Sequence, residues 1–326
     1  MKAEILRLLK ESDNYISGQQ LCDDFHVSRT AVWKVMEQLK KEGYQIEAVR
    51  NKGYRLIDSP DVMSQAEIDS LMKTEWAGRH TVYYDETDST NNRAKDAGEK
   101  GAEHGTLFVA DRQIAGKGRR GRAWESPAGS SIYMTILLYP RISPMKAPQL
   151  TLLMAIAVAE GIRQVTGLDT GIKWPNDIVR NGKKICGILT EMSTEIDYIN
   201  YVVIGVGINV NQKVFDEELK EKATSLMIET GAPVKRSALI AAVMKHFEKN
   251  YALFMENGDL SGLQESYNEM LVNRGKEVRI LEPGNEYNAH AYGINETGEL
   301  IVRTQKGEEK HIFAGEVSVR GIYGYV

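Results

Sequence analysis

Residues 111–126, DRQIAGKGRRGRAWES, combine three glycines with five cationic side chains, and no acid lies between Asp111 and Glu125. The set comprises Gly116, Gly118, Gly121, Arg112, Lys117, Arg119, Arg120 and Arg122. Glycines let a backbone approach a ligand closely, and backbone N–H groups together with guanidinium groups suit an anion such as phosphate. Trp124 adds an aromatic face. We therefore predict a mobile loop that closes over a phosphate-bearing ligand.

The same segment contains G-x-G-x-x-G, but it does not fit the dinucleotide-binding fingerprint. That fingerprint requires a strand before the glycines and a helix directly after them. Residues 106–110 are predicted as a strand, whereas Ala-Trp-Glu-Ser-Pro-Ala-Gly-Ser after the loop is a poor helix start. A Walker A loop is excluded because no G-K-[ST] occurs here. The remaining alternative is a solvated basic loop without a ligand.

Short polar side chains follow a predicted strand at residues 81–85. Segment 86–92, ETDSTNN, offers hydroxyl and amide groups that could bind a small polar head group. The alternative is a helix N-cap, with Asp88 or Ser89 beginning a helix that runs through Ala97. The two roles can coexist.

Two further strand ends carry groups suited to a nucleotide. In residues 171–179, GIKWPNDIV, Lys173 and Asp177 flank a rigid Trp-Pro pair. One lysine and one carboxylate at a strand end suit phosphate and a divalent cation. A buried strand at residues 201–208 leads to Asn209, whose amide could bind a base edge or a polar ring.

The remaining elements follow from periodicity and turn signals. Predicted helices cover 65–73, 148–165, 237–255 and 261–267, and predicted strands cover 132–139 and 185–191. Residues 212–223 are acidic and loop-like and could fold over a ligand. From residue 275 the pattern is short strands and turns, at 277–281, 287–294, 300–304 and 310–319, which predicts a small β-barrel.

The first sixty residues predict a winged helix-turn-helix. Apolar residues at helical spacing give a short first helix around 5–9, a second at 17–25 and a third at 29–42, followed by a hairpin of 44–49 and 54–57. The third helix would enter a DNA major groove with its N-terminal residues leading. The predicted DNA-binding residues are Ser17, Gly18, Gln19, Ser28, Arg29, Thr30, Trp33 and Lys34.

Positive charge is concentrated in this unit. Residues 29–55 hold seven Lys or Arg (29, 34, 40, 41, 50, 52 and 55) against three acids (37, 42 and 47), a net of +4. Residues 59–326 hold 31 basic and 36 acidic groups, a net of −5. This asymmetry favours contact with DNA phosphates. The alternative is a winged helix that contacts another protein.

Composition indicates a globular, intracellular protein. The chain is 42% hydrophobic and 26% charged, with a net charge of −4. Its N-terminus is charged throughout and has no signal-peptide core, and its longest apolar run, 150–159, is too short to span a bilayer. Cys22 and Cys186 are expected to be free thiols in a reducing compartment, and no cluster of Cys and His predicts a metal site. We therefore expect a cytoplasmic protein without a membrane partner.

Taken together, the motifs resemble the bifunctional biotin protein ligase and biotin-operon repressor family of bacteria. GKGRRGRAW at 116–124 is similar to the family's biotinyl-adenylate loop. KWPND at 173–177, GKKICGIL at 182–189 and GVGINVN at 205–211 are similar to its catalytic-core strings. The match covers nearly the whole chain in the same order.

The resemblance implies an α+β multidomain fold. It comprises a winged helix-turn-helix at 1–60, an α/β ligase domain with a mixed sheet at 61–270, and a small SH3-like β-barrel at 271–326. It implies ATP and biotin as substrates, Mg²⁺, and transfer of biotin from biotinyl-5′-AMP to one lysine of a biotin carboxyl carrier protein. It also implies that the adenylate-loaded protein forms a homodimer and binds the operator DNA of biotin genes.

The resemblance also implies roles for particular residues. Those expected to be catalytic are Arg119, Lys184, Lys173 and Asp177. Those expected to bind biotin or its adenylate are Ser89, Thr90, Asn91, Gln113, Gly116, Lys117, Gly118, Arg119, Arg122, Trp124, Lys184 and Asn209. The family's loop usually has Arg at the position of Lys117, and lysine keeps the charge but loses the bidentate fork. The acidic loop lacks a tryptophan that some relatives place over the adenine, and Val214 or Phe215 could substitute.

Two other functions fit parts of the pattern. A lipoate or octanoate ligase would share the core, although the basic glycine loop and the DNA module argue against it. A ligand-sensing repressor without ligase activity would keep the DNA module and the pocket. Biotin-dependent ATP–pyrophosphate exchange and biotin transfer to a carrier separate these functions.

Overall fold

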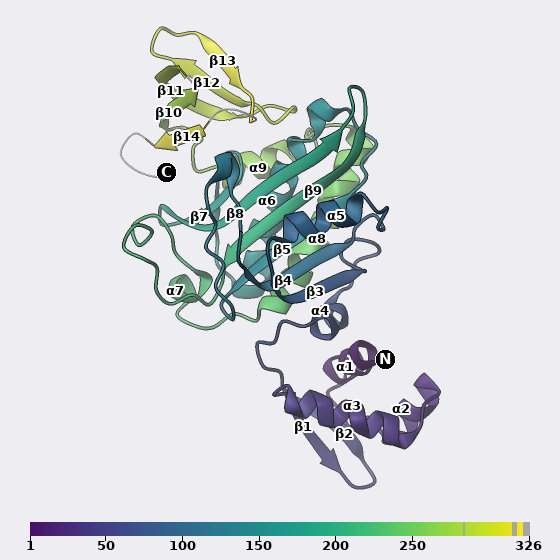
Figure 1. The fold of residues 1–326 in the computed structure, drawn as a ribbon. Helices are drawn as coiled ribbons and strands as arrows, with labels where there is room; N and C mark the ends of the chain where they lie inside the picture. Colours follow the sequence, from purple (N-terminus) through teal and green to yellow (C-terminus); the bar gives the residue numbers. More distant parts are fainter. Residues whose placement is uncertain (283, 315–317, 322–326) are drawn as a thin grey trace.

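The computed structural model describes residues 1–282, 284–314 and 318–321. Three units follow one another along the chain and through space (Figure 1). A small helical unit with the N-terminus lies at one end, a large sheet with helices lies in the middle, and a small sheet lies at the other end.

The first unit has the predicted winged helix-turn-helix order. It comprises α1 (Lys2–Glu11), α2 (Gly18–Phe25), α3 (Arg29–Lys41), β1 (Gln45–Val49) and β2 (Gly53–Asp58). The hydroxyls of Ser17 and Ser28 accept backbone N–H bonds at the starts of α2 and α3, which satisfies donors that a helix leaves unpaired. One apolar face from each helix forms a core of its own, which includes Leu6, Leu21 and Met36.

The central unit is built on a seven-stranded mixed sheet of order β3-β4-β5-β9-β8-β7-β6. Its strands are β3 (Thr81–Thr87), β4 (Leu107–Gln113), β5 (Ser131–Leu138), β6 (Gly171–Lys173), β7 (Asp177–Arg180), β8 (Lys183–Thr194) and β9 (Ile199–Asn209). β3 and β4 are parallel, and the other neighbours are antiparallel. Both faces of β5 are buried, as expected for a strand with helices on both sides.

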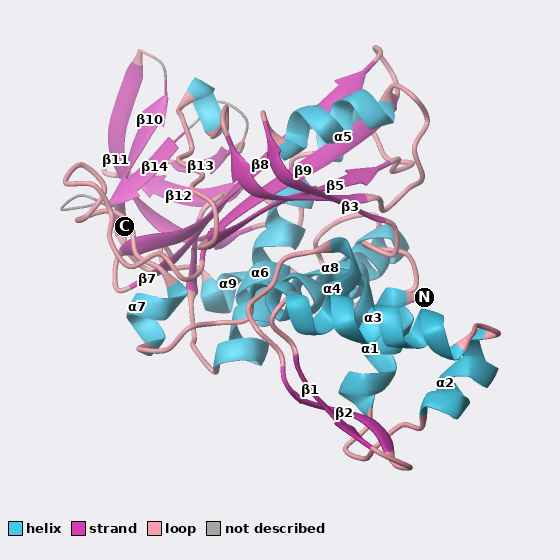
Figure 2. Cartoon of the chain, turned by 60° about the horizontal axis from the view of Figure 1, so that its bottom comes forward, coloured by secondary structure: helices cyan, strands magenta, loops and turns pink. Residues whose placement is uncertain are grey.

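Helices cover both faces of this sheet (Figure 2). α6 (Gln149–Thr166) and α8 (Arg236–Asn257) pack together on one face, while α5 (Thr90–Gly98) lies on the other. α4 (Gln65–Leu71), α7 (Leu226–Thr230) and α9 (Gln264–Met270) are shorter. The segment 144–166 is long and apolar enough to cross a membrane, but 72% of its apolar 18-residue window is buried inside the fold. It is therefore the central core helix of this unit.

The third unit is a five-stranded antiparallel sheet among the described residues, of order β13-β12-β11-β10-β14. Its strands are β10 (Glu277–Glu282), β11 (Asn285–Ile294), β12 (Leu300–Thr304), β13 (Glu309–Ile312) and β14 (Ser318–Gly321). It is joined to the central unit through Trp174, which is buried and donates its indole N–H to the carbonyl of Gly298 over 3.1 Å.

Sequence periodicity located most elements within a few residues of their ends but misjudged three places. The single strand predicted at 310–319 is wrong, because β13 and β14 lie on opposite edges of the small sheet. The helix predicted at 261–267 begins later, at Gln264. α7 was not predicted; its N-cap Ser225 accepts from Ile228 N, a local signal that the acidic stretch before it obscured.

Buried charges tie the first two units together. Lys10 of α1 lies 2.5 Å from Glu67 of α4, and the hydroxyl of Tyr44 donates to the other oxygen of Glu67, also over 2.5 Å. Burial and the Glu67 carboxylate both raise the pKa of Tyr44. The first unit is therefore held against α4 as well as being joined to the central unit by the linker.

The linker itself is held by Arg236 at the start of α8. This guanidinium is 4% exposed and lies 2.8 Å from Asp61 of the linker and 2.7 Å from Asp111 of β4. Asp61 also accepts from the amide of Asn211, which follows β9. Three separate segments therefore meet at one buried cation.

We predict that Arg236→Leu destabilises the central unit by about 3 kcal/mol, because its removal leaves two half-buried carboxylates without their cation. Arg279→Leu is the matched control, since Arg279 and Glu286 form an exposed pair, for which the expected cost is below about 1 kcal/mol. Thermal melting of both variants is the measurement. Equal melting temperatures for the two variants would show that the buried cluster contributes no more than a surface pair.

Candidate functional site

A cavity of about 690 Å³ opens at one edge of the central sheet. The sheet register brings there the carboxyl ends of β3, β4 and β9 and the amino ends of β5 and β8, because Thr87 pairs with Gln113 and Ser131 pairs with Asn209. Of the residues expected to bind ligand or act in catalysis, those that line it are Ser89, Thr90, Asn91, Gln113, Lys117, Gly118, Arg119, Arg122, Trp124, Asp177, Lys184 and Asn209. Segments that lie far apart in sequence therefore form one wall.

Two expected residues lie beside this cavity without lining it. Lys173 is buried on β6, one residue before Trp174, and is 4% exposed. Gly116 lies at the base of the basic loop, where an added Cβ would be 2.5 Å from the Trp124 carbonyl oxygen.

The polar end of the cavity is formed by the start of α5 and the end of β4. Ser89 occupies the N-cap position, yet its hydroxyl caps no backbone N–H among the described residues. Asp88 holds this turn instead, accepting from Asn92 and Arg93 over 2.7 and 3.0 Å. Burial raises the pKa of Asp88, but the hydrogen bonds from Asn92 and Ser89 N outweigh it, and the pKa falls to about 2. Asp88 therefore holds the turn before α5, while Ser89 takes the N-cap position and lines the cavity.

The basic loop is folded over the cavity and is held at several points. Gly116 accepts from Trp124 N over 2.9 Å, and Gly118 N donates to Arg122 O over 2.7 Å. Arg119 donates to Asn176 Oδ1 over 3.1 Å and to the carbonyl of Ala314, in the third unit, over 2.8 Å. Burial lowers the pKa of Arg119, although an arginine stays protonated at neutral pH.

Trp124 packs against strand positions that are occupied by glycine and therefore have no side chain. Gly187 of β8 and Gly207 of β9 are directly opposite each other. A Cβ added at Gly207 would lie 2.6 Å from the indole nitrogen, and one added at Gly187 would lie 3.0 Å from the far side of the ring. Gly205 makes room in the same way for Asn91, whose Oδ1 would be 2.1 Å from an added Cβ.

Lys184 lies above this ring. Its ammonium is 5.1 Å from the Trp124 ring centroid and 2.6 Å from a carboxylate oxygen of Asp177. The aromatic face and the carboxylate hold the ammonium in one place. The neighbouring Lys183 instead donates to the carbonyl of Lys220 on the exposed side.

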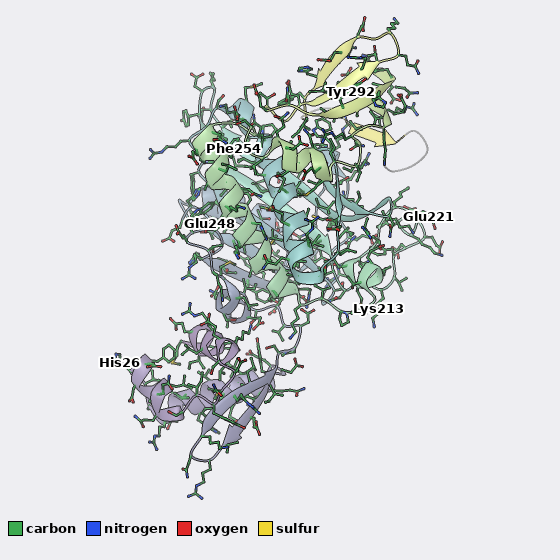
Figure 3. All side chains as sticks on the ribbon, turned by 180° about the vertical axis from the view of Figure 1, so that it is seen from behind. His26, Lys213, Glu221, Glu248, Phe254 and Tyr292 are labelled. Atoms are coloured by element: carbon green, nitrogen blue, oxygen red, sulfur yellow. The ribbon has the colours of Figure 1, made fainter. Side chains whose placement is uncertain are left out.

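The far wall is the acidic loop at 212–223. Asn209 is buried and donates to Thr224 O over 3.2 Å, and Lys184 N donates to Lys222 O over 2.8 Å. Phe215 faces the cavity, while Val214 is 78% exposed. Figure 3 shows Lys213 and Glu221 of this loop projecting from the side of the molecule, between His26 of the first unit and Tyr292 of the third.

The sequence alone did not point to the three glycines that face Trp124 and Asn91. Gly187, Gly205 and Gly207 line the cavity. Glycine inside a buried strand marks a place where something approaches the backbone closely. That signal was present in the string GVGINVN, but only the register of β8 against β9 shows what approaches.

The predicted DNA-contact residues of α3 form one exposed face. Arg29, Thr30 and Lys34 are exposed, and Trp33 is 54% exposed rather than part of the core. Arg29 donates to Gln19 of α2 over 2.9 Å, so the two helices present these side chains together. The hydroxyls of Ser17 and Ser28 serve as helix caps.

The site therefore combines a cluster of cations with a polar end and an aromatic surface. Four cationic side chains line the cavity from the loop, at Lys117, Arg119, Arg120 and Arg122, and Lys184 and Lys222 are two more. Partial desolvation strengthens their attraction for an anion. No group of three metal-ligating side chains occurs in the part of the chain that the structure describes.

Comparison with known proteins agrees with this geometry. The chain is 43% identical over 324 residues to "Bifunctional ligase/repressor BirA" of Bacillus subtilis, covering 98% of each sequence. The chain belongs to the BirA family of bifunctional ligase/repressors. It is also 28% identical to the BirA of Escherichia coli, over 97% of this chain and 96% of that protein.

Family models match each of the three units in turn, which agrees with membership of the BirA family. The profile of the Biotin/lipoate A/B protein ligase family matches residues 83–209, an HTH domain matches 2–55, and the Biotin protein ligase C terminal domain matches 275–320. The structure of "Biotin protein ligase from Aquifex aeolicus in complex with biotin and ATP" aligns with a TM-score of 0.67 at 31% identity. It covers 74% of this chain and 99% of that one.

We predict that Gly116→Ala loosens the basic loop, because its Cβ would overlap the Trp124 carbonyl oxygen. Gly118→Ala is the matched control, since the nearest atom to its Cβ would be 3.6 Å away and its φ is −109°. Trypsin cleavage within 117–122 should become several-fold faster in the first variant and stay unchanged in the second. Identical cleavage rates would rule out this role for Gly116.

Proposed function

We propose that this protein activates biotin with ATP to biotinyl-5′-AMP and then transfers biotin to a lysine of a biotin carboxyl carrier protein. We further propose that it represses biotin genes in response to the same ligand. The observation that supports this most directly is the joint placement of the basic loop, Trp124 and Lys184 over one cavity, in a chain of the BirA family.

The first step needs cations. A carboxylate that attacks an α-phosphorus approaches a centre surrounded by negative oxygens, and fixed cations relieve this repulsion as charge develops. Arg119, Lys117 and Arg122 reach the cavity from the loop, and Lys184 reaches it from β8. We assign Arg119 and Lys184 to the phosphate oxygens.

Asp177 acts on Lys184 in this scheme. Its carboxylate lies 2.6 Å from the ammonium, so it fixes the direction from which that cation meets the phosphate. Lys173 on β6 is the sheet partner of Asp177 on β7, and we assign it a supporting role outside the cavity. This assignment gives Asp177 a positioning role.

The loop protects the intermediate. A mixed anhydride hydrolyses in water, and a closed loop keeps water away until the acceptor amine arrives. The loop's contacts with Asn176 and Ala314 keep it over the cavity. We place biotin's ring at the polar end with Ser89, Thr90, Asn91 and Gln113, and the adenine toward Asn209.

We propose that Mg²⁺ enters with ATP as part of the substrate. The described residues do not fit a resident magnesium site, because no group of three acidic or histidine ligands lies together and Asp177 is already paired with Lys184. Magnesium in nucleotide enzymes is usually held by one or two carboxylates and the substrate phosphates. The chain's own contribution is then the cation cluster.

Three further expectations remain proposals. The resemblance implies a homodimer of the adenylate-loaded form and a cytoplasmic location. It also implies unit boundaries at 1–60, 61–270 and 271–326. These boundaries fall in the linker between β2 and α4 and in the break between α9 and β10. Both cysteines are buried free thiols, which agrees with a reducing compartment.

We predict that Lys184→Met lowers the rate constant of biotin-dependent ATP–pyrophosphate exchange by about 10²–10³-fold, the usual cost of removing one group that stabilises developing charge. Lys183→Met is the matched control and should keep the wild-type rate, because Lys183 lies on the exposed side. Equal rates in the two variants would remove Lys184 from the reaction. Exchange with lipoate but not biotin in the wild type would instead identify a lipoate ligase.

We predict that Arg29→Ala and Lys34→Ala weaken binding to DNA from the promoters of biotin genes. The slope of log affinity against log salt should fall by about one for each phosphate that the variant no longer binds. Both side chains lie on the exposed face of α3. Lys100→Ala removes an exposed charge from the central unit and serves as control. Fluorescence anisotropy in the presence of biotin and ATP is the measurement. If all three variants bind like wild type, α3 is not the DNA-contacting helix.

A further inference from the structure

The first unit is attached to the central unit in a different way from the third. Among the described residues, the buried apolar side chains of the first unit form a cluster of their own, whereas those of the third unit join the main cluster of the central unit. Yet α1 packs beside α4, the first helix of the central unit (Figure 1). The polar side chains between these two helices therefore carry much of the orientation of the first unit.

Glu67 of α4 is the buried centre of this contact. Its two carboxylate oxygens accept from the ammonium of Lys10 and from the hydroxyl of Tyr44, each over 2.5 Å. Lys10 is in the last turn of α1, and Tyr44 lies just past the end of α3. Lys10 also donates to the hydroxyl of Ser70 on α4 over 3.1 Å. One carboxylate thus binds the ends of two helices of the first unit to α4.

The local sequence indicates a different use for this side chain. Ser64 and Glu67 have the S-x-x-E spacing of a capping box, in which the glutamate accepts from the backbone N–H of the N-cap residue. Ser64 does cap α4, since its hydroxyl accepts from Glu67 N over 3.2 Å. Among the hydrogen bonds of the described residues, however, both carboxylate oxygens of Glu67 go to the first unit. The side chain is turned away from its own helix and toward the neighbouring unit.

The other ion pairs across this contact are exposed. Lys73 lies 3.5 Å from Glu11, and Lys235 lies 3.6 Å from Asp58, with every one of these side chains about half exposed or more. Exposed pairs contribute little, whereas breaking a buried pair is costly because it leaves a charge without its partner. Glu67 is therefore the side chain whose loss would free the first unit most.

The direction of α3 depends on this contact. Its predicted DNA-contact side chains lie toward its amino end, while Tyr44 lies just past its other end. A dimer that binds two half-sites needs its recognition helices at a distance and angle that match them. A first unit that could swing on its linker would accept several spacings and would lose orientational freedom on binding, which weakens affinity.

We propose that Glu67 is a positioning residue for DNA recognition: by holding Lys10 and Tyr44 it fixes the exposed face of α3 relative to the central unit, and so restricts the dimer to one half-site spacing. The inference rests on the proposed function, because it requires a dimer that binds DNA. Glu67 exerts this selection without touching the DNA.

The test compares binding to biotin-gene promoter DNA with binding to the same duplex lengthened by one or two base pairs at the centre of the site. Each added pair turns one half-site by about 35° relative to the other. Wild type should prefer the native spacing by at least about tenfold. Glu67→Ala should bind the native spacing about tenfold more weakly and prefer it by less than about threefold. Fluorescence anisotropy with biotin and ATP present is the measurement.

Three variants separate orientation from simple loss of a charge. Lys10→Met combined with Tyr44→Phe removes the same two bonds from the other side and should relax the spacing preference equally. Lys10→Arg keeps a cation for Glu67 and should retain the preference. Glu11→Ala removes the exposed pair with Lys73 across the same contact, and should bind every duplex like wild type.

A second measurement follows the orientation directly. In the protein without DNA, ¹⁵N relaxation gives the rotational correlation time of each unit. The two units of wild type should tumble together, whereas in Glu67→Ala the first unit should tumble faster than the central one. Retention of both sets of amide signals shows that each unit is still folded.

Three results would overturn the inference. If Glu67→Ala weakens every duplex by the same factor, or if its first unit still tumbles with the central unit, Glu67 does not set the orientation. If wild type binds all spacings equally, no orientation is fixed. Absence of any binding of wild type to promoter DNA would contradict the proposed repressor function itself, and is thereby distinguished from failure of the inference alone.

Discussion

The site depends on a strip of backbone without side chains. Gly187 and Gly207 face each other across β8 and β9, and Trp124 lies on them at distances that any Cβ would violate. Gly205, two residues along the same strand, admits the amide of Asn91 in the same way. The indole ring then supports the ammonium of Lys184. A side chain at Gly187 would displace Trp124 and Lys184, one at Gly207 would displace Trp124, and one at Gly205 would displace Asn91.

The basic loop joins units that are distant in the chain. Arg119 contacts Asn176 in the stretch after β6 and the carbonyl of Ala314 in the third unit. Trp174, next to that stretch, is anchored to Gly298 of the small sheet. The third unit, in which the sequence shows no chemistry, therefore helps to hold a cation that lines the cavity. Among the described residues, it contributes the carbonyl oxygens of Ala314 and Gly298.

Buried charge likewise connects the DNA-binding unit to the sheet edge that carries the site. Glu67 takes bonds from Lys10 and Tyr44, while Asp61 of the linker meets Arg236. Asp111, the other partner of Arg236, lies two residues before Gln113 on β4. Because an unpaired buried charge is costly, these pairs favour a single placement of the linker. These ion pairs therefore connect the first unit, through α4 and the linker, to the strand that ends at the cavity.

The sequence by itself determined the elements and the chemical types at the site. Helical and strand periods, together with capping serines such as Ser28, are local signals, so the order of helices and strands was predictable. The concentration of glycine and cations around Gly116 was sufficient to predict an anion-binding loop. The string similarity of the loop and of KWPND was sufficient to predict the family.

Only the tertiary structure decided which of these residues meet. The register between β8 and β9 places Trp124 on two glycines, and no local pattern encodes a register over more than a dozen intervening residues. Likewise, the hydroxyl of Thr135 reaches Thr90 and Asn91 only because β5 packs behind the start of α5. Residue type decides what each side chain can donate or accept, whereas packing decides which partner remains for it, because hydrogen bonds depend on distance in space and not along the chain.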